Sequence, residues 1–158
     1  MNIEKYTTSK LDEYTYQFNS FGPKGIIELR VVISEFFGED AYQGYNLAFG
    51  VWDDDLKVIN DTADTRNGDM DQILATVAEI ALVFLDSPSG GYIYAEGSNL
   101  ARTRKYQMGI SKYFSEIRAH FNVKGLIINS VQNESDRFEW EDIRSGKNYR
   151  AFALFKND

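Results

Sequence analysis

The sequence predicts a single α+β domain in which a mixed sheet carries two helices. Three observations lead to this fold class. The first sixty residues are rich in β-branched and aromatic residues and contain two turn signals, which favours an antiparallel meander of about four strands. Two long stretches with helical apolar periodicity follow, and short strand-like runs separate them. No linker, repeat or low-complexity block interrupts the chain, so residues 1–158 are assigned to one domain.

The meander is expected to consist of two strand pairs. The first pair is predicted at residues 14–19 and 29–37, with a Gly-Pro-Lys-Gly turn at 22–25. The second pair is predicted at residues 45–52 and 56–60, because the three aspartates between them suit a tight solvated turn.

The first helix is expected from Asp69 through about Leu85. Asp69 and Gln72 have the spacing of a capping box, and the apolar residues that follow recur on one helical face. Pro88 and the two glycines after it end the helix, since proline cannot continue the hydrogen-bond ladder. This helix is therefore predicted to be mostly buried.

The second half of the chain predicts a strand at 92–96, a helix from 99 to about 121 and a strand at 125–129. This βαβ spacing predicts that the two strands are neighbours and parallel, with a right-handed crossover. A final hairpin is expected from residues 137–141 and 148–156, which flank a Ser-Gly turn.

Composition excludes several classes of function. The chain has no cysteine, which removes disulfides, thiolate zinc sites and thiol nucleophiles and favours a cytoplasmic location. The N-terminus lacks a signal-peptide layout, and the longest apolar run is too short to span a membrane. The net charge of −7 disfavours general attraction to nucleic acid or anionic lipid. With one histidine, His120, no metal cluster of several imidazoles is possible, and no cofactor is expected.

The strongest candidate site follows the strand at 92–96. Gly97 and Ser98 turn the chain into a helix that opens with Arg102, Arg104 and Lys105. Positive charge beside a helix N-terminus attracts anions through the helix dipole and through free N–H groups. We therefore expect a phosphate or carboxylate site at this strand-to-helix turn.

Two further features belong to this candidate site. Arg102, Lys105 and Lys112 share one flank of the helix, and Gly109 lies in the gap between them, where it needs either a close packing partner or a ligand. Glu96 is expected at the same sheet edge as Asn129 and Ser130. The alternative is a solvated flank on which Glu96 pairs with Arg102 or Arg104. The candidate ligand-binding residues are Glu96, Gly97, Ser98, Arg102, Arg104, Lys105 and Gly109.

Other charged and aromatic residues have simpler interpretations. His120 is expected at the C-terminus of the second helix, where a cation is stabilised. The acidic stretch at residues 35–79 is assigned turn and capping roles, with a surface for a basic partner or a metal site as alternatives. Tyr42, Tyr45 and Trp52 are able to stack bases, but core packing is favoured for them. The chain contains no serine-nucleophile motif, P-loop or dinucleotide fingerprint.

Several segments resemble a domain family of unknown function, about 150 residues long and found chiefly in Bacteroidetes and related bacteria. The segments are Asn67-Gly68-Asp69 with the helix start after it, Ala95 to Ser98, Ala101 to Arg104, and a weaker match near Gly146. The resemblance covers the last two-thirds of the chain. It implies a small cytoplasmic bacterial or phage protein, and it brings no activity with it.

Two functions are carried forward. The first is a binding or interaction module that acts through a protein partner, self-association or a small anionic ligand, with bacterial defence, toxin–antitoxin or phage biology as the hypothetical context. The alternative is a phosphoryl- or nucleotide-processing enzyme, a hydrolase or nuclease. In that enzyme Arg102, Arg104 and Lys105 hold phosphate, and Glu96 acts as a base or metal ligand.

Overall fold

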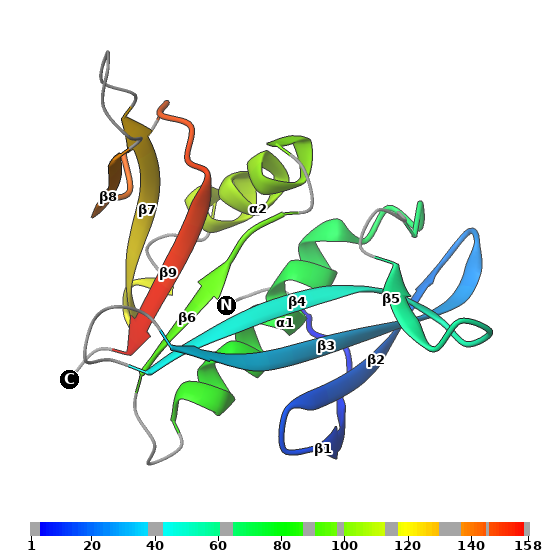
Figure 1. Ribbon diagram of the computed structural model, residues 1–158. Coiled ribbons are helices and arrows are strands. Elements are labelled where there is room, and N and C mark those ends of the chain that lie inside the picture. Colours follow the sequence, from blue (N-terminus) through cyan, green and yellow to red (C-terminus); the bar gives the residue numbers. More distant parts are fainter. Residues whose placement is uncertain are drawn as a thin grey trace.

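The computed structural model describes residues 4–37, 43–60, 65–86, 91–97, 100–112, 117–129, 137–144 and 146–156. Within these residues a mixed sheet of nine strands carries two helices, which confirms the α+β class (Figure 1). The strands are β1 (Ser9–Asp12), β2 (Thr15–Gly22), β3 (Gly25–Phe37), β4 (Gln43–Asp53), β5 (Val58–Asn60), β6 (Tyr92–Ala95), β7 (Phe121–Asn129), β8 (Arg137–Asp142) and β9 (Ala151–Lys156), and the helices are α1 (Met70–Leu85) and α2 (Leu100–Lys112).

The N-terminal part of the sheet is the expected antiparallel meander. β2 and β3 form the first hairpin, in which Gly22 pairs with Gly25, and the positive φ of 89° at Gly25 explains why a glycine stands there. β3 pairs with β4 along its length, and β5 returns along the end of β4 after the aspartate turn. β1, a short exposed strand on the outer edge of β2, was not predicted.

The strand order is β1-β2-β3-β4-β6-β9-β7-β8, and this order corrects two predictions. β6 and β7 are not neighbours, because β9 lies between them and runs antiparallel to both. β8 and β9 do not form a hairpin, since each pairs with β7 instead. The parallel pair in the sheet is β4 with β6, which α1 connects. The physical reason is the sequence of β9: Ala151, Phe152 and Ala153 are almost fully buried, as in a strand inside a sheet.

The second helix stops short of its predicted end near residue 121. Its described part runs to Lys112, Ile117 is again helical, and residues 118–120 form a turn before Phe121 begins β7. Phe121 and Val123 are buried while Asn122 between them is exposed, which is the alternation of a strand with one covered face. His120 lies in the turn between the helical Ile117 and β7, and its N–H donates a 3.0 Å hydrogen bond to the carbonyl oxygen of Ile117. The expected contact of its side chain with the C-terminus of the helix stays a prediction.

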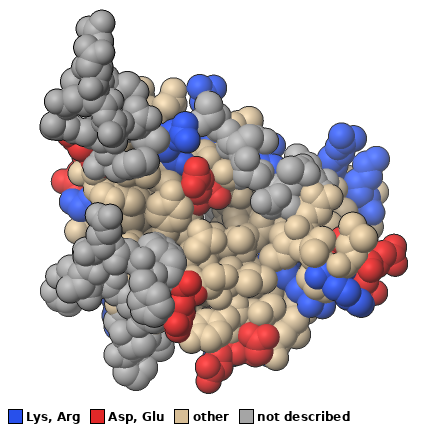
Figure 2. All heavy atoms as spheres, in the orientation of Figure 1, with Lys and Arg blue, Asp and Glu red and all other residues tan. Residues whose placement is uncertain are grey.

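Both helices pack on the same face of the sheet and lie behind it in Figure 1. Ile73 and Ile80 of α1 are buried with Val31 and Ile93 of the sheet in one apolar core. The other face of the sheet is turned to the viewer in Figure 2, where uncharged side chains occupy the centre and charged ones lie mostly around the margin. Among the described residues, no helix has the length and apolar character that a membrane span requires.

Candidate functional site

The predicted turn from β6 to α2 is closed by a contact within the chain. The N–H of Gly97 donates a 3.1 Å hydrogen bond to the Thr103 hydroxyl. A Cβ atom on residue 97 would lie 2.5 Å from the backbone nitrogen of Thr103, so only glycine permits this approach. Gly97 therefore packs against the first turn of α2. Ser98, the other turn residue of the predicted site, lies outside the described residues.

Glu96 is held by its own strand. Its carboxylate accepts a 2.9 Å hydrogen bond from the hydroxyl of Tyr94, and the burial of Tyr94 together with this bond raises the pKa of the phenol. The expected meeting of Glu96 with Asn129 required adjacent strands, and β9 separates β6 from β7. The Asn129 side chain and Ser130 lie outside the part of the chain that the structure describes.

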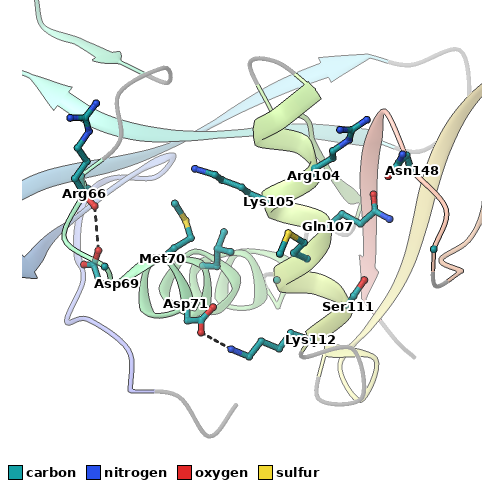
Figure 3. Close-up of a pocket in the computed structure, with 16 residues that line it drawn as sticks. Arg66, Asp69, Met70, Asp71, Arg104, Lys105, Gln107, Ser111, Lys112 and Asn148 are labelled. Atoms are coloured by element: carbon teal, nitrogen blue, oxygen red, sulfur yellow. Dashed lines mark hydrogen bonds and ion pairs between the residues drawn. The ribbon is translucent and has the colours of Figure 1, made fainter.

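Three of the predicted residues, Arg104, Lys105 and Gly109, line an open groove of about 940 Å³. The groove lies between α2 and the N-terminal end of α1, and a turn that includes Asn148 borders it (Figure 3). Glu96, Gly97 and Arg102 are not among its lining residues. The residues that line it are Thr65, Arg66, Gly68, Asp69, Met70, Asp71, Leu74, Arg104, Lys105, Gln107, Met108, Gly109, Ser111, Lys112, Gly146 and Asn148.

The groove is positively charged in a chain that is negatively charged overall. Among the lining residues that the structure describes, four are cationic, namely Arg66, Arg104, Lys105 and Lys112, and the two aspartates Asp69 and Asp71 oppose them, which leaves a formal charge of +2. The cations come from both walls: Arg66 precedes α1, and the other three lie on α2 (Figure 3). Lys105 extends from α2 toward the α1 side of the groove.

Both aspartates of the groove are engaged within the protein. Asp69 stands at the N-cap of α1, but its carboxylate makes no cap hydrogen bond, which corrects the expected capping box. It instead accepts hydrogen bonds from the hydroxyls of Tyr6 at 2.6 Å and Thr65 at 3.2 Å, and from Ser20. Asp71 pairs with Lys112 at 2.7 Å (Figure 3). Arg66, Arg104 and Lys105 are the other cationic lining residues, and guanidinium and ammonium groups bind anions through charge-assisted hydrogen bonds.

A family model matches residues 2–157. The chain belongs to DUF6934, a family of unknown function. This confirms the resemblance to a family of unknown function and extends it from the last two-thirds to nearly the whole sequence. A search of curated proteins and a search of solved structures found no match to the chain. Membership in DUF6934 carries no activity with it, so the function has to be argued from the groove.

Asn67, which contributed to the resemblance to DUF6934, has a structural role beside the groove. Its side-chain amide donates to the Ser20 hydroxyl at 3.0 Å and to the carbonyl oxygen of Gly25 at 3.1 Å, and its carbonyl accepts the Lys24 N–H at 2.7 Å. Asn67 is buried, and a buried polar side chain without hydrogen bonds would destabilise the folded state. These three bonds satisfy its amide. The β2–β3 hairpin is thereby fastened to the segment that carries Arg66.

Gly109 packs closely against α1 at the floor of the groove. A Cβ atom on residue 109 would lie 2.6 Å from Cδ1 of Leu74, the end of a flexible side chain, so Leu74 would have to shift to admit any other residue. Met70, Leu74 and Met108 give the floor an apolar character, and Met108 is 71% exposed. Neither methionine was among the predicted site residues, and neither was Arg66. No pattern in the sequence indicates the left-handed φ of 54° at Arg66.

The remaining candidates take structural roles where they are described. Tyr45 packs edge-on against Phe84 in the core, and Trp52 stacks under the guanidinium of Arg30 at 3.7 Å. Asp53 accepts two backbone N–H bonds in the β4–β5 turn, as the turn interpretation of the acidic stretch expects. Tyr42 lies outside the described residues.

Proposed function

We propose that this DUF6934 protein is a binding module and that the groove between α1 and α2 receives an anionic ligand. The observation that carries the proposal is the charge of the groove, which is +2 among its described lining residues in a chain of net charge −7. Cations gathered in a concave surface concentrate the local field and raise the concentration of anions there.

The direction of Lys105 supports a ligand that lies between the two walls, because this side chain extends from α2 toward the α1 side, whereas Arg104 points toward Asn148 (Figure 3). Arg66 is exposed before α1, and Arg104 and Lys105 are exposed on α2. The left-handed backbone at Arg66 costs free energy, and such conformations gather at functional sites. Arginine offers two parallel donors to a carboxylate or phosphate, and lysine adds a compact charge.

Binding is favoured over the alternative of phosphoryl chemistry by the position of the carboxylates. Glu96, the base of the enzymatic alternative, bonds to Tyr94 and does not line the groove. Asp69 and Asp71 do line it, but hydroxyl groups hold the first and Lys112 pairs with the second. A general base must reach the proton that it removes. These observations support a site that holds an anion.

The proposal is tested by calorimetric titration at low salt. The ligands are inorganic phosphate and small anions that carry one or two negative charges. The test variant is Arg104→Glu/Lys105→Glu. The control is Lys10→Glu/Lys156→Glu, which changes net charge equally at two positions outside the groove lining. We expect the test variant to lose at least tenfold in affinity and the control to lose less than about twofold, since exposed distant charges are screened.

Two results would contradict the proposal: no anion binds the wild-type protein, or both double variants lose affinity equally. The second result would mean that net charge, and not the groove, sets binding. Sedimentation of the wild-type protein tests the prediction of self-association separately. The cytoplasmic location and the bacterial or phage context stay predictions.

A further inference from the structure

A second space lies beneath the groove. It is an apolar cavity of about 90 Å³ between the two helices and the sheet. Its described lining comes from α1, α2, β4, β6 and β9 and from Ile117, and it is apolar apart from the hydroxyl group of Tyr106. The lining residues are Leu47, Phe49, Leu74, Ala75, Val77, Ala78, Ala81, Ile93, Ala95, Tyr106, Gly109, Ile110, Ile117, Phe152 and Leu154.

Leu74 and Gly109 line both the groove and the cavity. Leu74 is half-buried, and Cδ1 at the end of its side chain meets the backbone of Gly109. Gly109 has no side chain to block the way. The Leu74 side chain therefore lies between the groove and the cavity, and changes of side-chain rotamer are among the fastest motions of a protein.

We infer that the ligand of the groove is a small amphiphilic anion. Its phosphate or carboxylate head lies against Lys105, which extends toward the α1 side of the groove, and its short apolar chain passes Leu74 into the cavity. This inference rests on the proposed function, because it assumes that the groove binds the anionic head. It adds the requirement for an apolar chain of limited length.

The groove floor supports a ligand of this kind. Met70 and Met108 are flexible and polarisable, and methionine adapts to apolar groups of different shapes. A purely inorganic anion would make no apolar contact with the exposed side chain of Met108 and would not enter the apolar cavity. An apolar ligand chain that enters the cavity is removed from water, and the charged head of the ligand stays beside the cations of the groove.

The volume of the cavity sets the expected length of the chain. A volume of 90 Å³ is the volume that about three water molecules occupy in the liquid. The cavity therefore has room for a short apolar group of about three heavy atoms. Burial of one methylene changes binding by about 0.8 kcal/mol, or about fourfold in affinity. Affinity should therefore rise with the first few methylenes and then level off.

The test measures calorimetric affinities for methyl, butyl and hexyl phosphate, with butanoate and hexanoate as a parallel carboxylate series. We expect butyl phosphate to bind at least tenfold more tightly than methyl phosphate, and hexyl phosphate to add less than about fourfold more. The series in which the rise appears identifies the preferred head group.

Two variants locate the chain. Ala78→Leu places a larger side chain in the cavity and should abolish the gain from chain length while methyl phosphate binds as before. The exposed Ala101→Leu on α2 is the matched control and should keep the full gain. Leu74→Ala opens the common wall and should increase the advantage of hexyl phosphate at least threefold, which keeps the test decisive if Ala78→Leu does not fold.

The outcomes separate this inference from the proposed function. Equal affinities for methyl and hexyl phosphate in the wild-type protein would overturn the amphiphilic ligand and leave the anion site standing. A gain from chain length that Ala78→Leu and Leu74→Ala leave unchanged would overturn the cavity as its cause. Failure of every phosphate and carboxylate to bind would overturn the anion site itself.

Discussion

The hydroxyl of Tyr6 donates a 2.6 Å hydrogen bond to Asp69, which joins the N-terminal segment to the start of α1. The backbone N–H of Tyr6 also donates to the buried hydroxyl of Thr76 on the same helix, at 3.0 Å. The groove wall that begins at Arg66 is therefore held from two sides, by Tyr6 at Asp69 and by the β2–β3 hairpin at Asn67.

We expect Tyr6→Phe to lower the free energy of unfolding by about 1 to 2 kcal/mol, because a carboxylate loses a hydrogen-bond donor in a partly buried place. Tyr14→Phe is the control, since Tyr14 donates a comparable 2.8 Å bond to Glu35 on the exposed surface. It should change the free energy of unfolding by less than about 0.5 kcal/mol. Urea titration of both variants measures the difference, and equal losses would contradict a structural role for the Tyr6 bond.

Alkaline pH should destabilise the protein through Tyr94. Burial and the bond to Glu96 raise the pKa of this phenol in the folded state above its ordinary value of 10.0. The folded state thus favours the neutral phenol. Its contribution to the free energy of unfolding is complete below pH 10 and is lost as the pH rises above that value.

The loss for one such group approaches about 1.4 kcal/mol for each pH unit above 10, reduced by solvent screening because Tyr94 is only half-buried. Urea titrations between about pH 9 and pH 11 should show a shallower loss in Tyr94→Phe than in the wild-type protein. The exposed Tyr14→Phe should change the slope less. Parallel pH curves for wild type and Tyr94→Phe would show that Tyr94 ionises equally in both states.

Gly125→Ala should destabilise the protein by about 1 to 3 kcal/mol, because a Cβ atom there would lie 2.3 Å from the ring of the buried Tyr149. A double-mutant cycle with Tyr149→Leu tests the cause. With the ring removed, the methyl group gains space, and the coupling energy between the two substitutions should be at least about 1 kcal/mol. Strict additivity would mean that residue 125 is sensitive for another reason.

Hydrogen exchange should be slowest in β9. Its amides lie between β6 and β7, whereas β1 is an exposed strand at one end of the strand order. Local opening exposes edge strands before central ones. Mass spectrometry of peptic fragments should find residues 151–156 protected far longer than residues 9–12. Equal exchange in both segments would contradict the central position of β9.

The sequence predicted local structure better than strand neighbours. Turn chemistry located the β2–β3 hairpin, and apolar periodicity located α1 to its last residue, Leu85. Pairing between distant strands has no such local signature, which is why β6 and β7 were wrongly placed side by side. The continuous apolar run Ala-Phe-Ala-Leu-Phe in β9 is typical of a strand covered on both faces, and it was the available signal for a central position.

The candidate site was predictable only in part for a similar reason. Charge and helical spacing identified Arg104, Lys105 and Gly109 on one element. The opposite wall belongs to a segment about forty residues earlier, and its approach depends on how α1 and α2 pack against the sheet. Arg66 and Met70 therefore carried no sequence signal of a common site. Met108 lies beside Gly109 on the predicted helix, but exposure of a single methionine is readable only from the structure.

The position of β9 also constrains how the chain is made. In the order of the described strands, β1 to β6 and β7 to β8 are joined through β9, which follows all of them in the sequence. Until residues 151–156 emerge, the inner edges of β6 and β7 lack the strand that later fills them, and unpaired edges invite intermolecular pairing. A chain in which β9 has not yet paired is thus exposed to aggregation, and a truncation before residue 151 would leave two partial sheets in place of one.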